Sequence, residues 1–509
     1  MSLLARLWLR PMNALAIKSN ALYYIFTSLF AAIGYGYVFI FPVLAVLSPA
    51  LLINAALTES PLQWQLHDWL VSAALLLTCA IAIWICFKIL KIKPDLPAGK
   101  PLDAENFPTL LGRISELCTS FNAPEIHHVK LTPHFRLEII RTPTSSFPLK
   151  YSNTLLIGLP LMSSISPLHF KLLLARQIGH LALAKASFAR RIIYIRQTLE
   201  IYKHTYNRSW KPETLLLRLF FSWYSPWFNL TTIPMLRLET SHKDKCMLEV
   251  TPSENAAAGI TDFCIKKAFI ETSFWPDLNN SAYKLENPPY FPHSTMSRYV
   301  TNKLDPDKIK RLYESEISRS IEADSTVPSL KDRLYAIGYD ELITTDGLNE
   351  TAAAYFLENH VDDIYKQFDN IWYLQNKKAW GQKYNQGLQE KKKLKLMRDQ
   401  ISKSLLSDPE IREYLQLIDK YVGPEKALPL YKEIVSAGPQ DSDLCFDLGR
   451  LLLKADDSSG INALKKSMDQ NPDYTVDCCN HIVEYLVKHG DTKEAQNYRR
   501  IILEHQAER

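Results

Sequence analysis

The segment from Leu172 to Leu183 places Arg176 and His180 four residues apart, with Gln177 after the arginine. In the zinc-binding pattern H-E-x-x-H, two histidines at this spacing share a helix face and bind the metal, while the glutamate activates a metal-bound water. Here Arg176 stands at the first ligand position and Gln177 at the general-base position. A guanidinium group cannot ligate zinc and an amide cannot accept a proton. His180 is therefore the one suitable group left in the pattern.

A helix and a small sheet are expected to position these side chains. Ser166 followed by Pro167 is a favourable helix start, and a helix beginning there carries Arg176 and His180 on one face. Hydrophobic periodicity predicts an earlier helix and three short strands, at residues 107–121, 126–131, 136–141 and 154–159. The expected fold class is α+β and mostly helical.

Two uncharged, apolar runs near the N-terminus, residues 19–58 and 69–87, are each long enough to cross a bilayer. The first run is longer than one span needs, and we expect Pro42 and Pro49 to mark its end, with the rest near the membrane interface. A cleaved signal peptide is the rival interpretation, but the run exceeds a normal signal core and a second apolar run follows.

Basic residues flank the two runs, and the stretch between the runs has none: Arg6, Arg10, Lys18, Lys88, Lys91 and Lys93. The positive-inside rule then predicts a multi-pass protein of the inner (cytoplasmic) membrane, with soluble domains that face the cytoplasm. Eight cysteines without metal-type spacing fit reduced thiols in that compartment. The net charge of +5 over 509 residues shows no concentrated basic patch, so nucleic acid is not an expected partner.

Two further segments are expected to be helical. Residues 215–235 are aromatic but interrupted by Arg218, Pro226 and Pro234, which favours an interfacial or core-packing helix over a third span. Residues 364–406 are polar and rich in lysine and glutamine. A solvated connecting helix explains their composition better than a basic docking patch, although such a patch could lie on anionic lipid.

The C-terminal part carries a weak internal repeat. Ala427, Ala463 and Ala495, each after a nearby glycine, lie 36 and 32 residues apart, which brackets the period of about 34 residues in tetratricopeptide units. Stacked helix pairs of this kind form surfaces that bind peptides or proteins. An ordinary helical bundle without a partner is the alternative.

Taken together, the chain resembles the HtpX-like and CAAX-prenyl-protease family of membrane zinc metallopeptidases, and in particular bacterial members with C-terminal tetratricopeptide repeats. The resemblance covers about residues 102–338. Four segments carry it in the family's order, at residues 153–161, 176–180, 237–244 and 328–334.

The resemblance implies a third zinc ligand, a glutamate four residues before an aspartate that orients a ligand histidine. With Asp244 as that aspartate, the ligand position is Thr240, which is unsuitable. A replacement ligand set of His180, Glu239 and His242 would need a rotated helix. If the fold is kept, Arg176 would lie near Asp244, and we expect an ion pair there in place of the metal's structural role.

The family's usual histidine before Pro328 is also changed, to Val327. The expected organisation is a two-helix membrane anchor, a gluzincin-like domain, a helical connector and a repeat domain, at residues 1–92, 93–345, 346–406 and 407–509. We expect an inactive relative that binds polypeptides through its cleft and repeats, as a scaffold, adaptor or protein quality-control factor. No cofactor is expected. The alternatives are an active zinc metalloendopeptidase with a non-standard metal site, and a structural protein in which the repeats alone bind.

Overall fold

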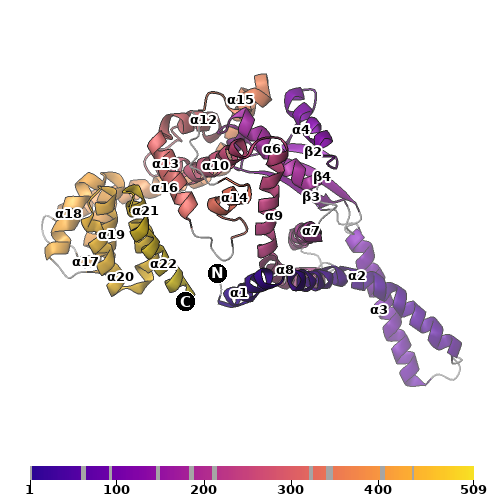
Figure 1. Cartoon of the computed structure of the whole chain (residues 1–509). Coiled ribbons are helices and arrows are strands. Elements are labelled where there is room, and N and C mark those ends of the chain that lie inside the picture. The colour runs from indigo at the N-terminus through magenta and orange to yellow at the C-terminus, as the bar shows by residue number, and fades with distance from the viewer. Residues whose placement is uncertain are drawn as a thin grey trace. The chain divides into compact units, whose positions relative to one another are not determined.

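The computed structural model describes residues 3–58, 65–90, 94–144, 150–182, 188–208, 215–319, 325–339, 348–401, 407–437 and 441–508. The chain divides into two compact units, whose elements are labelled in Figure 1. The first unit holds residues 1–262 and 321–360, and the second holds 263–320 and 361–509. These divisions fall elsewhere than the four expected domains, whose boundaries stay a prediction.

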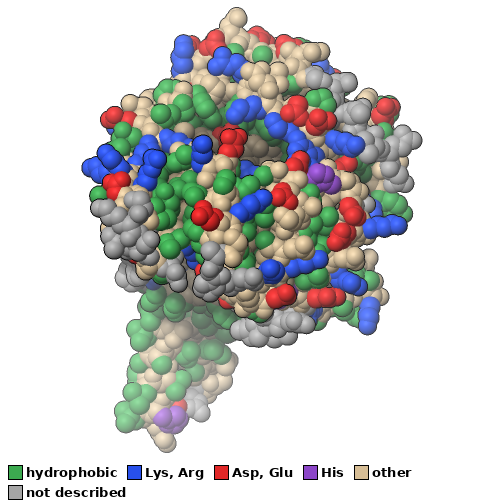
Figure 2. All heavy atoms as spheres, turned by 90° about the vertical axis from the view of Figure 1, so that its left-hand side faces the viewer, with side chains coloured by type: hydrophobic (Ala, Val, Ile, Leu, Met, Phe, Trp, Pro, Cys, Tyr) green, Lys and Arg blue, Asp and Glu red, His purple; other side chains and the backbone are tan. Residues whose placement is uncertain are grey.

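Three apolar helices open the first unit: α1 (Leu3–Lys18), α2 (Asn20–Thr58) and α3 (Leu66–Leu90). Two stretches are long and apolar enough to cross a membrane, Phe39–Thr58 in α2 and Leu66–Phe87 in α3. Only 11% of each stretch is buried by protein, unlike the core helix of a soluble domain. Figure 2 shows hydrophobic side chains around the α2–α3 hairpin, at the bottom of the view.

The expectation that Pro42 and Pro49 end the first apolar run is wrong. Both prolines lie inside α2, and the candidate span begins three residues before Pro42 and continues past Pro49. Proline has no amide hydrogen, so Pro49 leaves the carbonyl of Ala45 without its helical donor. The Cys79 thiol on α3, with Sγ 3.7 Å from that oxygen, donates instead. Such replacement donors allow proline inside apolar helices.

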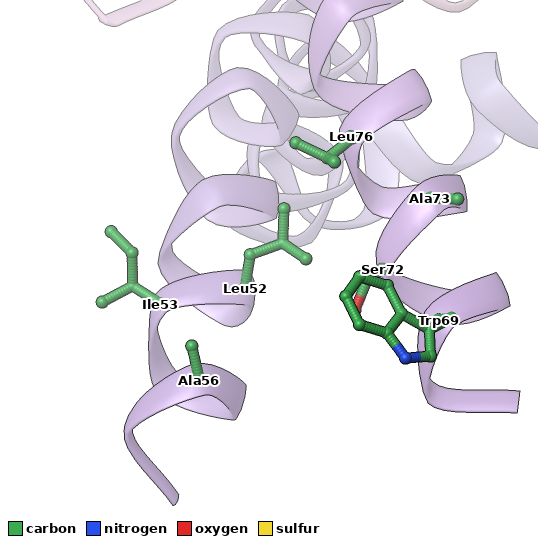
Figure 3. Close-up of a pocket in the computed structure, with 7 residues that line it drawn as sticks. All are labelled: Leu52, Ile53, Ala56, Trp69, Ser72, Ala73 and Leu76. Carbon is green, nitrogen blue, oxygen red and sulfur yellow. The ribbon is translucent and has the colours of Figure 1, made fainter. Parts of the chain in front are cut away.

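An apolar groove separates α2 and α3 toward their connection (Figure 3), with a volume of about 380 Å³. Leu52 and Ala56 line it from α2, and Trp69 and Leu76 from α3. The Ser72 hydroxyl and the indole N–H of Trp69 are the polar side-chain groups among its lining residues. A surface of this composition suits lipid chains better than a polar ligand.

A four-stranded sheet in the order β1-β2-β4-β3 forms the β part of the first unit. Its strands are β1 (Lys100–Pro101), β2 (His128–Thr132), β3 (Leu137–Pro143) and β4 (Tyr151–Gly158). The central pair β2–β4 is parallel, while β1–β2 and β3–β4 are antiparallel. The three predicted strands are confirmed with shifted ends, and β3 is an edge strand.

Helices and short turns complete the first unit: α4 (Pro108–Ser120), α5 (Leu159–Met162), α6 (Pro167–Ala182), α7 (Phe188–Arg208), α8 (Leu215–Thr231), α9 (Ile233–Lys245), η4 (Cys246–Glu249), α14 (Leu330–Ala336), α15 (Ala352–Leu357) and η6 (Glu358–His360). The predicted start of α6 is confirmed, since the Ser166 hydroxyl accepts a hydrogen bond from the His169 amide at 3.2 Å. Gly179 lets α6 approach η4, because a Cβ there would lie 2.7 Å from Cβ of Cys246.

The boundary between the units falls within α10 (Ser253–Phe269). The second unit then contains η5 (Ile270–Phe274), α11 (Trp275–Ser281), α12 (Pro292–Lys303), α13 (Pro306–Ser318) and α16 (Val361–Ile401). Helix α16 confirms the predicted long polar helix over its described residues. The ammonium of Lys393 on α16 lies 2.5 Å from the carboxylate of Glu413, so part of the basic run is neutralised within the chain.

Three helix pairs end the second unit: α17 (Asp408–Tyr421) with α18 (Pro424–Ala437), α19 (Ser442–Lys454) with α20 (Ser459–Gln470), and, after η7 (Pro472–Tyr474), α21 (Thr475–Lys488) with α22 (Thr492–Glu508). Ala427, Ala463 and Ala495 each lie in the second helix of a pair, so the repeated alanines mark equivalent places. The tetratricopeptide assignment itself stays a prediction.

His293, at the start of α12, is a buried histidine whose ring has no hydrogen-bond partner among the described residues. Its backbone amide and that of Ser294 donate to the Asp369 carboxylate, at 2.7 and 3.1 Å. Burial lowers the pKa of His293 to about 4, and the charge of Asp369 offsets only part of this effect. The folded state therefore holds the imidazole neutral and unpaired.

We expect acid to loosen α12 through His293. Between pH 6.5 and about 4 the unfolded state binds a proton that the folded state does not, so stability falls as pH falls, by up to about 1.4 kcal/mol per pH unit. Hydrogen exchange of α12 followed from pH 7 to pH 4 should show this loss. His293→Leu should largely remove it; equal acid sensitivity in that variant would show that another group is responsible.

Candidate functional site

A buried carboxylate on α9, that of Asp244, lies at the centre of the candidate site. Its Oδ1 is 2.6 Å from Nε of Arg176 on α6. Arg333 on α14 donates twice, from Nε to Oδ2 at 2.7 Å and from Nη2 to Oδ1 at 2.9 Å. Asp244 is fully buried, and Arg333 is nearly so. One carboxylate thus connects three helices through three charge-assisted hydrogen bonds.

The two guanidinium groups keep Asp244 ionised. Burial alone would raise the pKa of this carboxyl, because a charge is poorly solvated inside protein. The positive charges of Arg333 and Arg176, with their hydrogen bonds, outweigh burial and lower the pKa below its ordinary value. The ion pair between Arg176 and Asp244 that the sequence predicted is present. Arg333 was missed as a partner, although its segment had been singled out.

A second polar cluster lies one helical turn along α6. Nε2 of His180 is 2.9 Å from Oε2 of Glu239, and Nδ1 of His242 is 3.3 Å from Oε1 of the same carboxylate. Glu239 and His180 are buried. The two imidazoles therefore face one carboxylate, each opposite a different oxygen.

Helix α9 presents Glu239 to His180, and not Thr240. The Thr240 hydroxyl donates to the carbonyl of Leu236 at 2.9 Å, within its own helix. Counting four residues back from Asp244 gives Thr240, which is therefore not the residue on α9 that contacts His180. From the sequence, Glu239 is a candidate only as one of the three residues of the replacement ligand set, with His180 and His242.

The side chains present do not fit a zinc ion. The first ligand position holds the Arg176 cation paired to Asp244, and the nitrogen of His180 that faces α9 already contacts Glu239. Over the part of the chain that the structure describes, no three His, Cys, Asp or Glu side chains are arranged to hold a metal ion. We therefore derive no metal-dependent step from this site.

Gln177, to which the resemblance gives the general-base position, binds the edge of the sheet. Its Nε2 donates to the carbonyl of Leu137 on β3 at 2.6 Å, and the side chain is buried. Leu137 lies opposite Ile157 on β4, while the neighbouring Gly158 amide donates to Arg136. The carbonyl that Gln177 binds therefore points to the open side of the edge strand.

Lys243 brings another cation to the same region of α9. Burial lowers the pKa of its ammonium to about 8, and the charge of Arg176 acts in the same direction. Glu239, Glu138 and Asp244 oppose this shift only in part. The region is thus rich in cations, with guanidinium and ammonium groups where the resemblance implies a metal.

We expect Arg333→Ala to lower the free energy of unfolding by roughly 3–5 kcal/mol, because it removes two of the three hydrogen bonds to the buried Asp244 carboxylate. Arg176→Ala should lower the free energy of unfolding less, by about 1–3 kcal/mol, since Asp244 keeps both hydrogen bonds from Arg333. Denaturant unfolding and hydrogen exchange of α6, α9 and α14 would measure both.

The matched control for these variants is Arg136→Ala, which removes an ion pair to Glu138 at the surface, 3.0 Å long. Such pairs contribute at most about 1 kcal/mol. Arg333→Lys should be less destabilising than Arg333→Ala, because lysine keeps the positive charge but cannot donate two parallel hydrogen bonds to the carboxylate. If Arg333→Ala were as mild as the control, the cluster would not hold the helices together.

Lys243→Met should stabilise the first unit at pH 7, by roughly 1 kcal/mol for a side chain that keeps some solvent contact. Between pH 8 and 10.5 the unfolded state binds the proton that folded Lys243 releases, so native stability should rise with pH across this window. The variant should lose that rise. Lys245→Met, at an exposed position of the same helix, is the control and should keep it.

Comparison of the chain with models of protein families finds no match, and neither do comparisons with curated proteins and with solved structures.

Proposed function

We propose that this chain is a membrane-anchored, catalytically inactive relative of the HtpX-like zinc peptidases, which acts by binding polypeptides as a scaffold, adaptor or quality-control factor. The observation that carries the proposal is the Arg176–Asp244–Arg333 cluster. In this proposal the cluster replaces the implied metal with fixed positive charge, and its ion pairs link the surrounding helices.

The convergence of the four resembling segments supports the peptidase-like part of the proposal. Strand β4 leads through α5 to α6, and α9 packs against both α6 and α14. The positions for metal binding and water activation hold Arg176, Gln177 and Thr240, and the first two have new partners in the structure. Hydrolysis would need a base and a metal-activated water at these positions.

The binding role rests on the three C-terminal helix pairs, since stacked pairs bury a continuous core and leave an extended face for a partner. The anchoring role rests on the two candidate spans. The basic residues that flank the spans support a cytoplasmic position for the soluble parts. The inner membrane of a bacterium is part of the proposal because the chain resembles bacterial members of the family.

Zinc content tests the proposal directly. Elemental analysis of the detergent-purified chain should find no stoichiometric zinc. Arg176→His/Gln177→Glu restores the first ligand and the base while leaving Glu239 next to His180, and we expect this variant to bind about one zinc. In this variant Asp244 keeps its two hydrogen bonds from Arg333, which favours folding.

A second variant adds Thr240→Glu, and it tests whether the ligand position counted from Asp244 can be reached. Thermal unfolding of each variant shows whether it is folded, and binding is scored only for folded protein. Near-equimolar zinc in the native chain, together with cleavage of an unfolded protein substrate, would overturn the proposal. That result would favour the active enzyme with His180, Glu239 and His242 as ligands.

A further inference from the structure

Helix α8 is apolar on its outward face as well as on its buried face. Leu217, Phe221, Tyr224 and Phe228 are buried against the first unit. The outward face exposes four large apolar side chains, with these exposed fractions: Leu215 42%, Leu216 49%, Leu219 59% and Trp223 64%. A helix on a water-facing surface normally carries polar residues on that side, so this face needs an apolar partner.

The buried face fixes the rotation of α8 about its axis. The Phe220 ring stacks on Tyr37 of α2 with ring centres 3.9 Å apart, and the Tyr37 hydroxyl donates to the carbonyl of Leu216 at 3.2 Å. Farther along, the Tyr224 hydroxyl donates to the carbonyl of Phe30 at 2.5 Å. Helix α8 therefore runs antiparallel to the first half of α2, and its outward side chains cannot turn inward without breaking these contacts.

These contacts place the start of α8 at the edge of the candidate span. Tyr37 lies two residues before Phe39, where the span begins, which is about 3 Å along a helix. Phe30 lies nine residues before Phe39, about 14 Å along α2. The headgroup region on each side of a bilayer is roughly 5–8 Å thick. Leu216 and Leu219 thus lie beside the start of the candidate span, and Trp223 lies farther from it along α2. The outward face reaches the headgroups over its whole length only where α8 runs along the bilayer surface, the region in which tryptophan is enriched.

The charges around α8 suit an anionic bilayer surface. Neither α1 nor α8 contains an acidic residue. Helix α1 packs on the far end of α8, where Nε1 of Trp8 donates to the Thr231 hydroxyl at 2.9 Å. Arg10 and Lys18 on α1 are exposed, and so is the apolar Ile17, which is 87% exposed. Apolar side chains combined with basic ones are the composition of helices that lie in a membrane interface.

We propose that the outward face of α8 is a membrane-binding surface that rests in the interface of an anionic phospholipid bilayer, next to the α2 span and without crossing the bilayer. The bilayer would cover Leu215, Leu216, Leu219 and Trp223. A second copy of the chain or another protein on this face is the competing occupant.

Photolabelling of the full chain in lipid nanodiscs tests the surface. The discs contain phosphatidylcholine and phosphatidylglycerol, with a diazirine on an acyl chain near the headgroup. Trypsin cleaves after Arg218 and releases a peptide that begins at Leu219 and includes Trp223. We expect lipid adducts on this peptide as well as on α2 and α3. Adducts confined to α2 and α3 would overturn the proposal, because this face would then not contact lipid.

Leu219→Gln/Trp223→Gln should reduce labelling of that peptide at least about threefold and leave labelling of the spans unchanged. Both side chains are exposed, so the exchange leaves the core of the first unit intact. The matched control is Leu248→Gln, at an exposed leucine on η4, which should alter neither signal. Unchanged labelling in the double variant would mean that these side chains do not contact lipid.

Discussion

The charge of one buried carboxylate determines how the centre of the first unit is held together. An ionised group without solvent is costly unless it is paired and hydrogen-bonded, and Asp244 accepts three hydrogen bonds from Arg176 and Arg333. These partners are 68 and 89 residues away in sequence. Any displacement of α6 or α14 from α9 would leave a charge unpaired. The arrangement therefore links the three helices without a metal, through groups that offer no open coordination position for a substrate.

The sequence predicted much of this arrangement, and its errors have physical reasons. The cap at Ser166 and the strands before it follow from local patterns, and the approach of Arg176 to Asp244 follows from the fold that the resemblance implies. Glu239 could not be chosen over Thr240 in this way, since neighbouring helix positions point about 100° apart. An arginine is also longer than an imidazole, so its contact with Asp244 does not fix the rotation of α9.

Prediction failed for another reason at Pro42 and Pro49. Proline usually ends a helix in water because its ring clashes with the preceding turn and one hydrogen bond is lost. In α2 the uncharged sequence continues on both sides, and a thiol from the neighbouring helix serves one freed carbonyl. That thiol comes from Cys79 on α3, which local rules do not consider.

In the C-terminal helix pairs, polar contacts such as Gln416–Asp447 and Arg450–Asp419 each span 31 residues, a spacing shorter than that of the alanines.

The hydrogen bond from Gln177 to Leu137 has a consequence for how the protein can hold another chain. An edge strand recruits a foreign strand through its outward carbonyl and amide groups. On β3, the amide of Gln177 occupies one such carbonyl, and Pro143 offers no amide hydrogen at the end of the same strand. A polypeptide could pair with this part of β3 as a fifth strand only by displacing Gln177. Recognition of extended chains by strand addition is thus obstructed at β3, and the edge at β1, which is two residues long, and the surfaces of helices are left to perform it.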